Sequence, residues 1–132
     1  MGDVTAPMKD DEERPVPTAW RPVFESIVEA IARGTVETAA ELPRVDQIDP
    51  ETAQQIRDAI KDYGDDLSDG VTLLPLPDEA WETCIAAWQG DSWEVLIDLW
   101  SQEEGHSDLV LRAKVRDDGD EWRVAIGMVY VP

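Results

Sequence analysis

The chain has a single cysteine, a single histidine and no long apolar run. The lone cysteine, Cys84, forms neither an internal disulfide nor a metal site built from several cysteines. A membrane-spanning helix would need about 20 consecutive apolar residues. The N-terminus also lacks the cationic segment followed by an apolar core that marks a secretory signal. We therefore expect a cytoplasmic protein in a reducing compartment, with no membrane partner.

Basic residues are scarce, with 11 Lys and Arg against 30 Asp and Glu and a net charge of −19. The fifty residues 62–111 contain thirteen acidic residues and no Lys or Arg. Such a charge repels phosphates and anionic membranes, so we expect no direct binding of nucleic acid. Two explanations of the acidity stay open: a docking surface for a basic partner, and the adaptation of a whole proteome to high salt.

Motifs that carry common chemistry are missing. The sequence has no phosphate-binding glycine loop, nucleophile elbow, paired-cysteine motif or complete calcium loop. Cys84 lies in an apolar context without a nearby base, which favours a packed thiol over a nucleophile. We expect no cofactor, no bound metal and no catalytic residue, which favours a protein that is not an enzyme but leaves an enzyme as an open alternative.

The length of 132 residues suits one domain, which we place at residues 18–132 after a disordered acidic tail at residues 1–17. Apolar residues at helical spacing predict a first helix that follows Thr18 as N-cap and ends before Gly34. A second helix is predicted with Asp49 as N-cap, Pro50 at its first position and Gly64 at its end.

The C-terminal half changes to alternating apolar and polar residues, which predicts three consecutive strands. A turn at residues 117–120 would join the last two strands, with Arg116 opposite Glu121. In the preceding pair, Trp100 would lie opposite Asp108. The predicted inner face then carries Trp93, Val95, Ile97, Leu99, Leu109, Leu111, Ala113, Val115, Trp122, Val124, Ile126, Met128 and Tyr130.

Residues 78–88 fit two interpretations. The start at Pro77 favours a helix, whereas Thr83, Cys84 and Ile85 suit a strand, and we expect a helical turn that runs into a strand. If Trp88 pairs with Trp93 in a strand, then Trp81 lies opposite Trp100 and Ile85 lies opposite Leu96.

The second face of the sheet would be mixed in character, because apolar and charged residues alternate with the inner set. Either a helix or the proline-rich loop packs over it, or it is an exposed aromatic patch with acidic neighbours, as at an interface hot spot. In the second case Trp81 and Trp100 would be the anchors.

The segment "LWSQEEGHSDLVL" places the only histidine, His106, between two predicted strands. A hairpin connection explains its polar residues and Gly105. Acid–base chemistry at His106 would need a positioned partner such as Glu103, Glu104 or Asp108 and a pocket. A metal site would need further ligands, and there is no second histidine.

The pattern "WEVLIDLWSQEEGHSDLVL" followed by "VAIGMVYVP" resembles a group of small uncharacterised bacterial proteins with a "DLW…EEG.SDL…VYVP" ending. The resemblance covers the last third to half of the chain and implies no activity. Two helices followed by an antiparallel sheet are also similar to cystatin-like and NTF2-like architectures, which host both enzymes and binders.

We expect an α+β domain with two N-terminal helices packed on a C-terminal antiparallel β-meander of three to four strands. The first functional hypothesis is a non-enzymatic acidic binding protein, an immunity-type inhibitor or adaptor that engages a basic protein. Its partner-binding residues would be Trp81, Asp98, Trp100, Glu103, Glu104, His106 and Asp108. The alternative is a small-molecule binder or enzyme with a pocket between sheet and helices, lined by Trp20, Trp93, Trp122, Tyr130 and His106.

Overall fold

The computed structural model describes residues 12–67, 70–117 and 121–132. Its elements are, in chain order, β1 (Arg14–Pro15), η1 (Thr18–Trp20), α1 (Arg21–Ala32), η2 (Val36–Glu41), α2 (Pro50–Asp66), η3 (Asp78–Glu82), β2 (Ile85–Trp88), β3 (Trp93–Ser101), β4 (Gly105–Asp117) and β5 (Trp122–Tyr130), where η marks a 3-10 helix.

The strands form one antiparallel sheet in the order β1-β2-β3-β4-β5, so the fold is α+β. The sheet has five strands, and the expected three to four is therefore an underestimate. The extra strand is the two-residue β1, which pairs with β2 through Arg14 opposite Ala86 and Pro15 opposite Ile85. So short a strand, paired with a distant segment, leaves no periodic signal in the sequence.

The predicted disordered tail at residues 1–17 is wrong for its last part. Pro15 belongs to β1, and Val16 is 1% exposed within the core. An apolar side chain that the core buries holds this segment against the sheet. Residues 1–11 lie outside the described part of the chain.

Both predicted helices form, with changes at their ends. The amides of Gly34 and Thr35 bond back to Ile31 and Ala30, and Gly34 has a φ of 77°, so a glycine C-cap ends α1 as predicted. Thr18 opens η1 and does not cap α1, which begins after Trp20.

The start of α2 is as predicted, because Asp49 Oδ1 accepts from the amide of Glu51 at 3.0 Å and Pro50 follows. Its end is not at Gly64, since the helix continues to Asp66. Gly64 is buried, and a Cβ there would lie 3.0 Å from the amide nitrogen of Val71. This glycine therefore allows a close chain approach.

Residues 78–88 fold as a helical turn followed by a strand, as expected. Trp88 pairs with Trp93 and Ile85 with Leu96. Trp81 is in η3 and 5% exposed, so the prediction that it lies opposite Trp100 is wrong. The helical turn ends the extended backbone before that pairing can reach residue 81.

The register between β3 and β4 follows the prediction from Trp93 to Asp98 and then shifts by two residues, so that Trp100 pairs with His106 and not with Asp108. Ser107 lies at this irregularity. Its buried hydroxyl donates to the carbonyl of Leu99 at 2.7 Å and accepts from the amide of Leu109 at 3.2 Å. A bulge satisfied by a side chain thus replaces regular pairing.

The last hairpin pairs Arg116 with Arg123, two residues from the predicted partner Glu121. A shift by two preserves the faces of the strand. The predicted turn at residues 117–120 lies outside the described residues, except for Asp117, which ends β4 and pairs with Trp122.

A bulge at Gly127 reverses the faces of β5. The register shifts between Arg112 and Ala113, and a Cβ on Gly127 would lie 2.7 Å from the carbonyl oxygen of Arg112. Beyond the bulge it is Val129, at 0% exposure, that faces the core. The prediction that Met128 and Tyr130 lie on the inner face is therefore wrong, because one inserted residue inverts the alternation.

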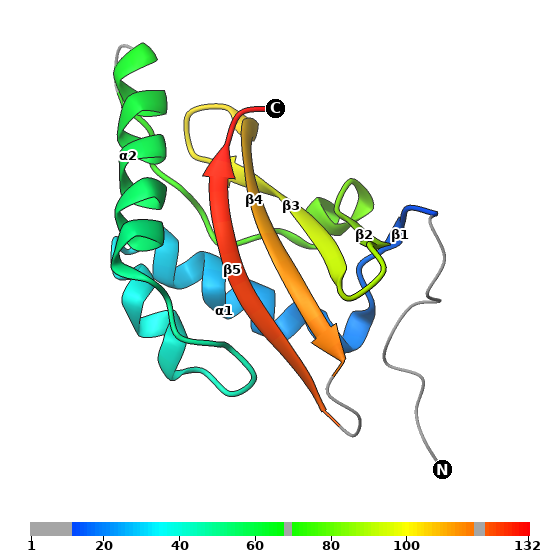
Figure 1. The fold of residues 1–132 in the computed structure, drawn as a ribbon. Helices are drawn as coiled ribbons and strands as arrows, with labels where there is room; N and C mark the ends of the chain where they lie inside the picture. Colours follow the sequence, from blue (N-terminus) through cyan, green and yellow to red (C-terminus); the bar gives the residue numbers. More distant parts are fainter. Residues whose placement is uncertain (1–11, 68–69, 118–120) are drawn as a thin grey trace.

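One core lies between the helices and the inner face of the sheet. Trp20 packs edge-on against Trp93 at 5.5 Å between ring centroids and lies 5.7 Å from Trp122. In Figure 1, α1 lies behind the sheet, α2 runs along its β5 side, and no helix of the described chain crosses the front face.

Candidate acidic site

The β3–β4 turn is held by hydrogen bonds to the carboxylate of Glu103 and from the backbone amide of Glu104. Glu103 accepts from the amide of Thr72 at 2.7 Å, and the amide of Glu104 donates to Ser101 Oγ at 3.1 Å. The hydrogen bond from Thr72 holds the pKa of Glu103 below its usual range. Segment 72–74 also pairs with the end of β3, since the amide of Leu74 donates to the carbonyl of Trp100. The turn that carries two predicted site residues is therefore well fixed.

Tyr63 connects this hairpin to α2. Its hydroxyl donates to the Glu104 carboxylate and accepts from the amide of Asp108 at 3.1 Å. Partial burial, together with the bond to Glu104, raises the pKa of Tyr63. Both sides of the hairpin are thus attached to the last turns of the helix.

Three other predicted site residues meet on the open face of the sheet. The rings of His106 and Trp100 stack with centroids 5.4 Å apart and planes 10° apart. His106 Nε2 lies 3.2 Å from Asp98 Oδ2, and the two side chains are 45% and 19% exposed. A stacked and paired imidazole of this kind can hold an aromatic side chain in place or present a hydrogen bond, and the contacts supply no nucleophile for it to activate.

Trp81 is the predicted site residue that the structure does not bring to this group. It is buried in η3, with the guanidinium of Arg21 5.3 Å from its ring centroid. The interaction with Arg21 is a cation–π contact within the fold, so Trp81 is not an exposed anchor.

The exposed face of α2 supplies carboxylates that the sequence reasoning missed. Asp58, Asp62 and Asp66 repeat every four residues, about 6 Å apart along the helix axis, and all three are exposed. Their spacing was the available signal. We call Asp58, Asp62 and Asp66 together with the hairpin residues Glu103, Glu104 and Asp108 the acidic pole.

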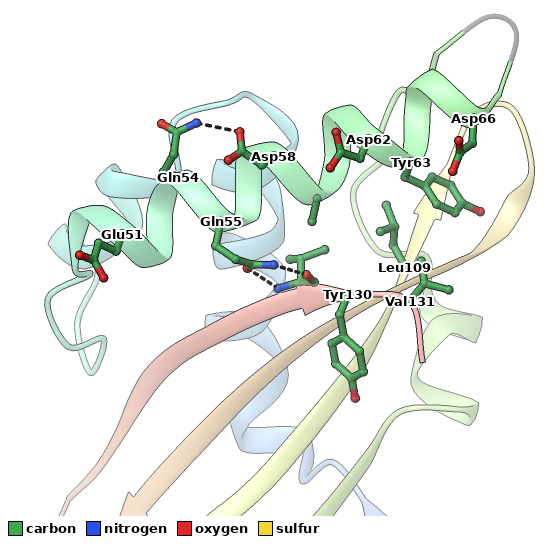
Figure 2. A pocket seen from close by; sticks show the side chains of 12 residues that line it. Glu51, Gln54, Gln55, Asp58, Asp62, Tyr63, Asp66, Leu109, Tyr130 and Val131 are labelled. Carbon is green, nitrogen blue, oxygen red and sulfur yellow. Dashed lines mark hydrogen bonds between the residues drawn. The ribbon is translucent and has the colours of Figure 1, made fainter.

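A groove of about 650 Å³ runs between α2 and the end of β5. Figure 2 shows its two sides, the helix above with Asp58, Asp62 and Asp66, and the strand below. Apolar side chains form its floor, whereas Tyr130 points away from the helix. The floor consists of Ala59, Tyr63, Leu109, Val129 and Val131.

The side-chain amide of Gln55 closes the sheet edge within this groove. Gln55 Nε2 donates to the carbonyl of Val129 at 2.7 Å, and Gln55 Oε1 accepts from the amide of Val129 at 3.1 Å (Figure 2). Farther along the same edge, Val124 is paired with residues 44–46. Backbone pairing by another strand is therefore blocked at these two positions.

Arginines gather at the other end of the sheet. Arg116 and Arg123 donate to the two oxygens of Asp46 at 2.8 and 2.7 Å, and Arg44 lies 4.8 Å from the ring centroid of Trp122. Partial burial tends to raise the pKa of Asp46, but the two arginine hydrogen bonds outweigh it and hold that pKa below its usual value. About 33 Å of strand separates His106 from Arg116 in β4, so the two charge types are well apart.

Few features of the described residues suggest chemistry on a bound substrate. Burial raises the pKa of the Cys84 thiol to about 11, and its Sγ donates to the carbonyl of Ala80. Among residues 12–67, 70–117 and 121–132, no three His, Cys, Asp or Glu side chains are arranged to hold a metal ion. No helix in those ranges is long and apolar enough to span a membrane.

Comparison with other proteins gives a family and no function. No curated protein and no solved structure matches this chain. The model of a domain of unknown function, DUF7668, matches residues 28–132. That match includes the end of α1, all of α2 and strands β2 to β5, and the chain belongs to this family.

Proposed function

We propose that this protein is a non-enzymatic acidic binding protein, an immunity-type inhibitor or adaptor that engages a basic protein through the acidic pole. The separation of charge in the fold is the observation that carries this proposal. The base-free stretch 62–111 contributes Asp62, Asp66 and the hairpin carboxylates to one end, whereas Arg44, Arg116 and Arg123 lie at the other.

Negative charge concentrated at one end of the fold affects how strongly and how fast a cationic partner associates. Like charges close together produce a local potential that attracts a cationic surface and accelerates its encounter, and salt weakens both effects. Adaptation to high salt would be served equally well by carboxylates spread over the whole surface. Exposed carboxylates also lie outside the acidic pole, as at Glu79 and Glu82 of η3, and docking is supported by the thirteen acidic residues without any Lys or Arg in residues 62–111.

The acidic residues near the end of α2 also destabilise this helix. Asp62 and Asp66 occupy its last turns, where the helix dipole favours cations; Lys61 pairs with Asp65 at 3.0 Å, and no basic residue lies in the last turn. Asp58, Asp62 and Asp66 repel one another at four-residue spacing. A cationic partner would relieve both costs.

The experiment is affinity capture from the native organism at low salt, followed by elution with a salt gradient. The bait is the wild-type chain, compared with a variant that combines Asp62→Asn, Asp66→Asn and Asp108→Asn. These exposed carboxylates accept none of the hydrogen bonds that hold the hairpin turn. We expect a stoichiometric basic protein that elutes as salt rises and is lost from the variant.

The matched control carries Asp78→Asn, Glu79→Gln and Glu82→Gln, three exposed carboxylates of η3 away from the acidic pole. It should retain the partner. A partner that binds wild type and the acidic-pole variant equally would contradict the proposal.

The alternative, a small-molecule binder, is supported less well. Of its expected lining, Trp20 and Trp93 are fully buried against each other, while His106 and Tyr130 lie on the outer side of the sheet, so the set does not line one pocket. The groove beside α2 is the place where such a ligand would bind. A metabolite retained in the capture experiment without any protein would favour this alternative.

A further inference from the structure

The floor of the groove between α2 and β5 is apolar, and part of it is open to solvent, although Leu109 and Val129 are buried. Val131, which is 53% exposed, is the exposed large apolar residue of the described chain. Tyr63 and Ala59 beside it are only partly buried. Apolar surface in a concave site gains free energy when a ligand covers it, which is why such sites bind partners.

The wall of the groove selects the charge of that ligand. Carboxylates of Glu51, Asp58, Asp62 and Asp66 line it, and no Lys or Arg of the described residues does. A second copy of this chain, with its net charge of −19, would be repelled, as would a nucleic acid or an anionic membrane. The ligand is therefore cationic, with an apolar part to cover the floor.

The sheet edge limits the backbone of the ligand. Gln55 already occupies the amide and carbonyl of Val129, so a strand cannot pair there. A helix needs no such pairing, because its own backbone groups are bonded within it. Its residues at four-residue spacing also repeat about every 6 Å, the same interval as Asp58, Asp62 and Asp66 on the wall.

We propose that the groove binds an amphipathic basic helix of the partner, which inserts an aliphatic side chain over Val131 and Tyr63 and places Lys or Arg against Asp58, Asp62 and Asp66. This inference rests on the proposed function, since it names the segment of the basic partner that docks. It adds an apolar anchor, which long-range charge attraction alone would not require.

Two fluorescent peptides of about 18 residues test it, both with an alanine background and lysine at every fourth position. One has leucines on the adjacent stripe, and the other has serines at those positions. We expect the leucine peptide to bind at least about tenfold more tightly, because covering a leucine corresponds to about that factor in affinity. Anisotropy titrations at about 50 and 300 mM salt give the affinities and their salt dependence.

Variants locate the contact. Asp62→Asn with Asp66→Asn should weaken the leucine peptide about fivefold or more, whereas Glu79→Gln with Glu82→Gln, the same change of net charge, should stay within about twofold. Val131→Ser should reduce the preference for leucine over serine and leave the serine peptide unchanged. All are exposed positions, and circular dichroism of each variant checks that it is folded.

The outcomes separate the two proposals. Equal, salt-sensitive binding of both peptides, or equal effects of the two carboxylate pairs, would overturn the groove assignment and leave the acidic binding function standing. A preference for leucine that survives Val131→Ser would overturn it as well. If neither peptide binds at the lower salt concentration, the groove assignment fails and the basic-partner function loses its support from this surface.

Discussion

The side-chain amide of Gln55 forms with Val129 both of the hydrogen bonds that the backbone of an adjoining strand would form. A helical residue thus completes the pairing of an edge strand. This relationship fixes α2 on the sheet and shields the edge from unwanted strand addition.

Replacing Gln55 should therefore cost more than replacing its neighbour. Gln55→Ala leaves the amide and carbonyl of Val129 without their protein partner, and we expect a loss of about 1–3 kcal/mol in the free energy of unfolding. Gln54→Ala removes only an exposed bond to Asp58 and should cost less than about 0.5 kcal/mol. Urea unfolding of both variants measures the difference, and similar losses would contradict this account.

Gly127 should not tolerate a side chain. Gly127→Ala places a Cβ 2.7 Å from the carbonyl oxygen of Arg112, a contact that backbone must move to relieve, and we expect a loss of about 1–3 kcal/mol. Met128→Leu, a change of similar volume next to it, should stay within about 1.5 kcal/mol. Thermal unfolding compares the two, and a Gly127→Ala variant as stable as wild type would show that the bulge is not needed.

Tyr63→Phe should loosen the acidic pole without unfolding the core. The change removes the bonds to the Glu104 carboxylate and the Asp108 amide, at an expected cost of about 1 kcal/mol. Hydrogen exchange should speed up at the Asp108 amide and remain unchanged at the buried residue Leu111. Unaltered exchange at Asp108 would mean that the hydroxyl does not hold the hairpin.

Lowering the pH should weaken the ion pairs that Asp46 forms with Arg116 and Arg123. Its pKa in the folded protein lies below the unfolded value of about 3.9, so the arginine pairing stabilises the fold above pH about 4. That stabilisation is lost as pH falls through the folded pKa. Asp46→Asn should cost about 0.5–1 kcal/mol at neutral pH and flatten this part of the pH profile of unfolding. An unchanged slope between pH 4 and lower values would contradict the assignment.

Neutralising the end of α2 should stabilise the isolated protein. Asp66→Asn removes a charge that opposes the helix dipole and repels Asp62, for an expected gain of about 0.3–1 kcal/mol at low salt. The gain should shrink as salt is added. Glu79→Gln, outside any long helix, is the control and should have no such effect. A destabilised Asp66→Asn variant would indicate that this carboxylate supports the fold.

The parts of the fold that sequence predicted are those governed by local patterns. Alternation placed β3 and β4 on the correct faces, and Gly34 and Asp49 marked two helix ends. Pairing of β1 was missed because it joins residues 14–15 to a distant strand. The reversed end of β5 was missed because Gly127 reads equally well as an ordinary residue in an alternating run.

The candidate site was likewise predicted in part, where its residues are close in sequence. The hairpin carboxylates were predicted from charge, since they lie together in the chain. The contribution of α2 needed the tertiary contact through Tyr63, which no local pattern encodes. Trp81 was expected at this site on the assumption of a longer strand, and the helical turn η3 removes it.

The distance between the carboxylates of the acidic pole and the arginines beside Asp46 contributes to an electric dipole moment along the sheet. In the field of a cationic body such a molecule experiences a torque before any contact is made. It would rotate until the β3–β4 hairpin and the end of α2 face the cationic body. Collisions would then begin in an orientation close to that of the docked complex, with less rotational searching at the surface.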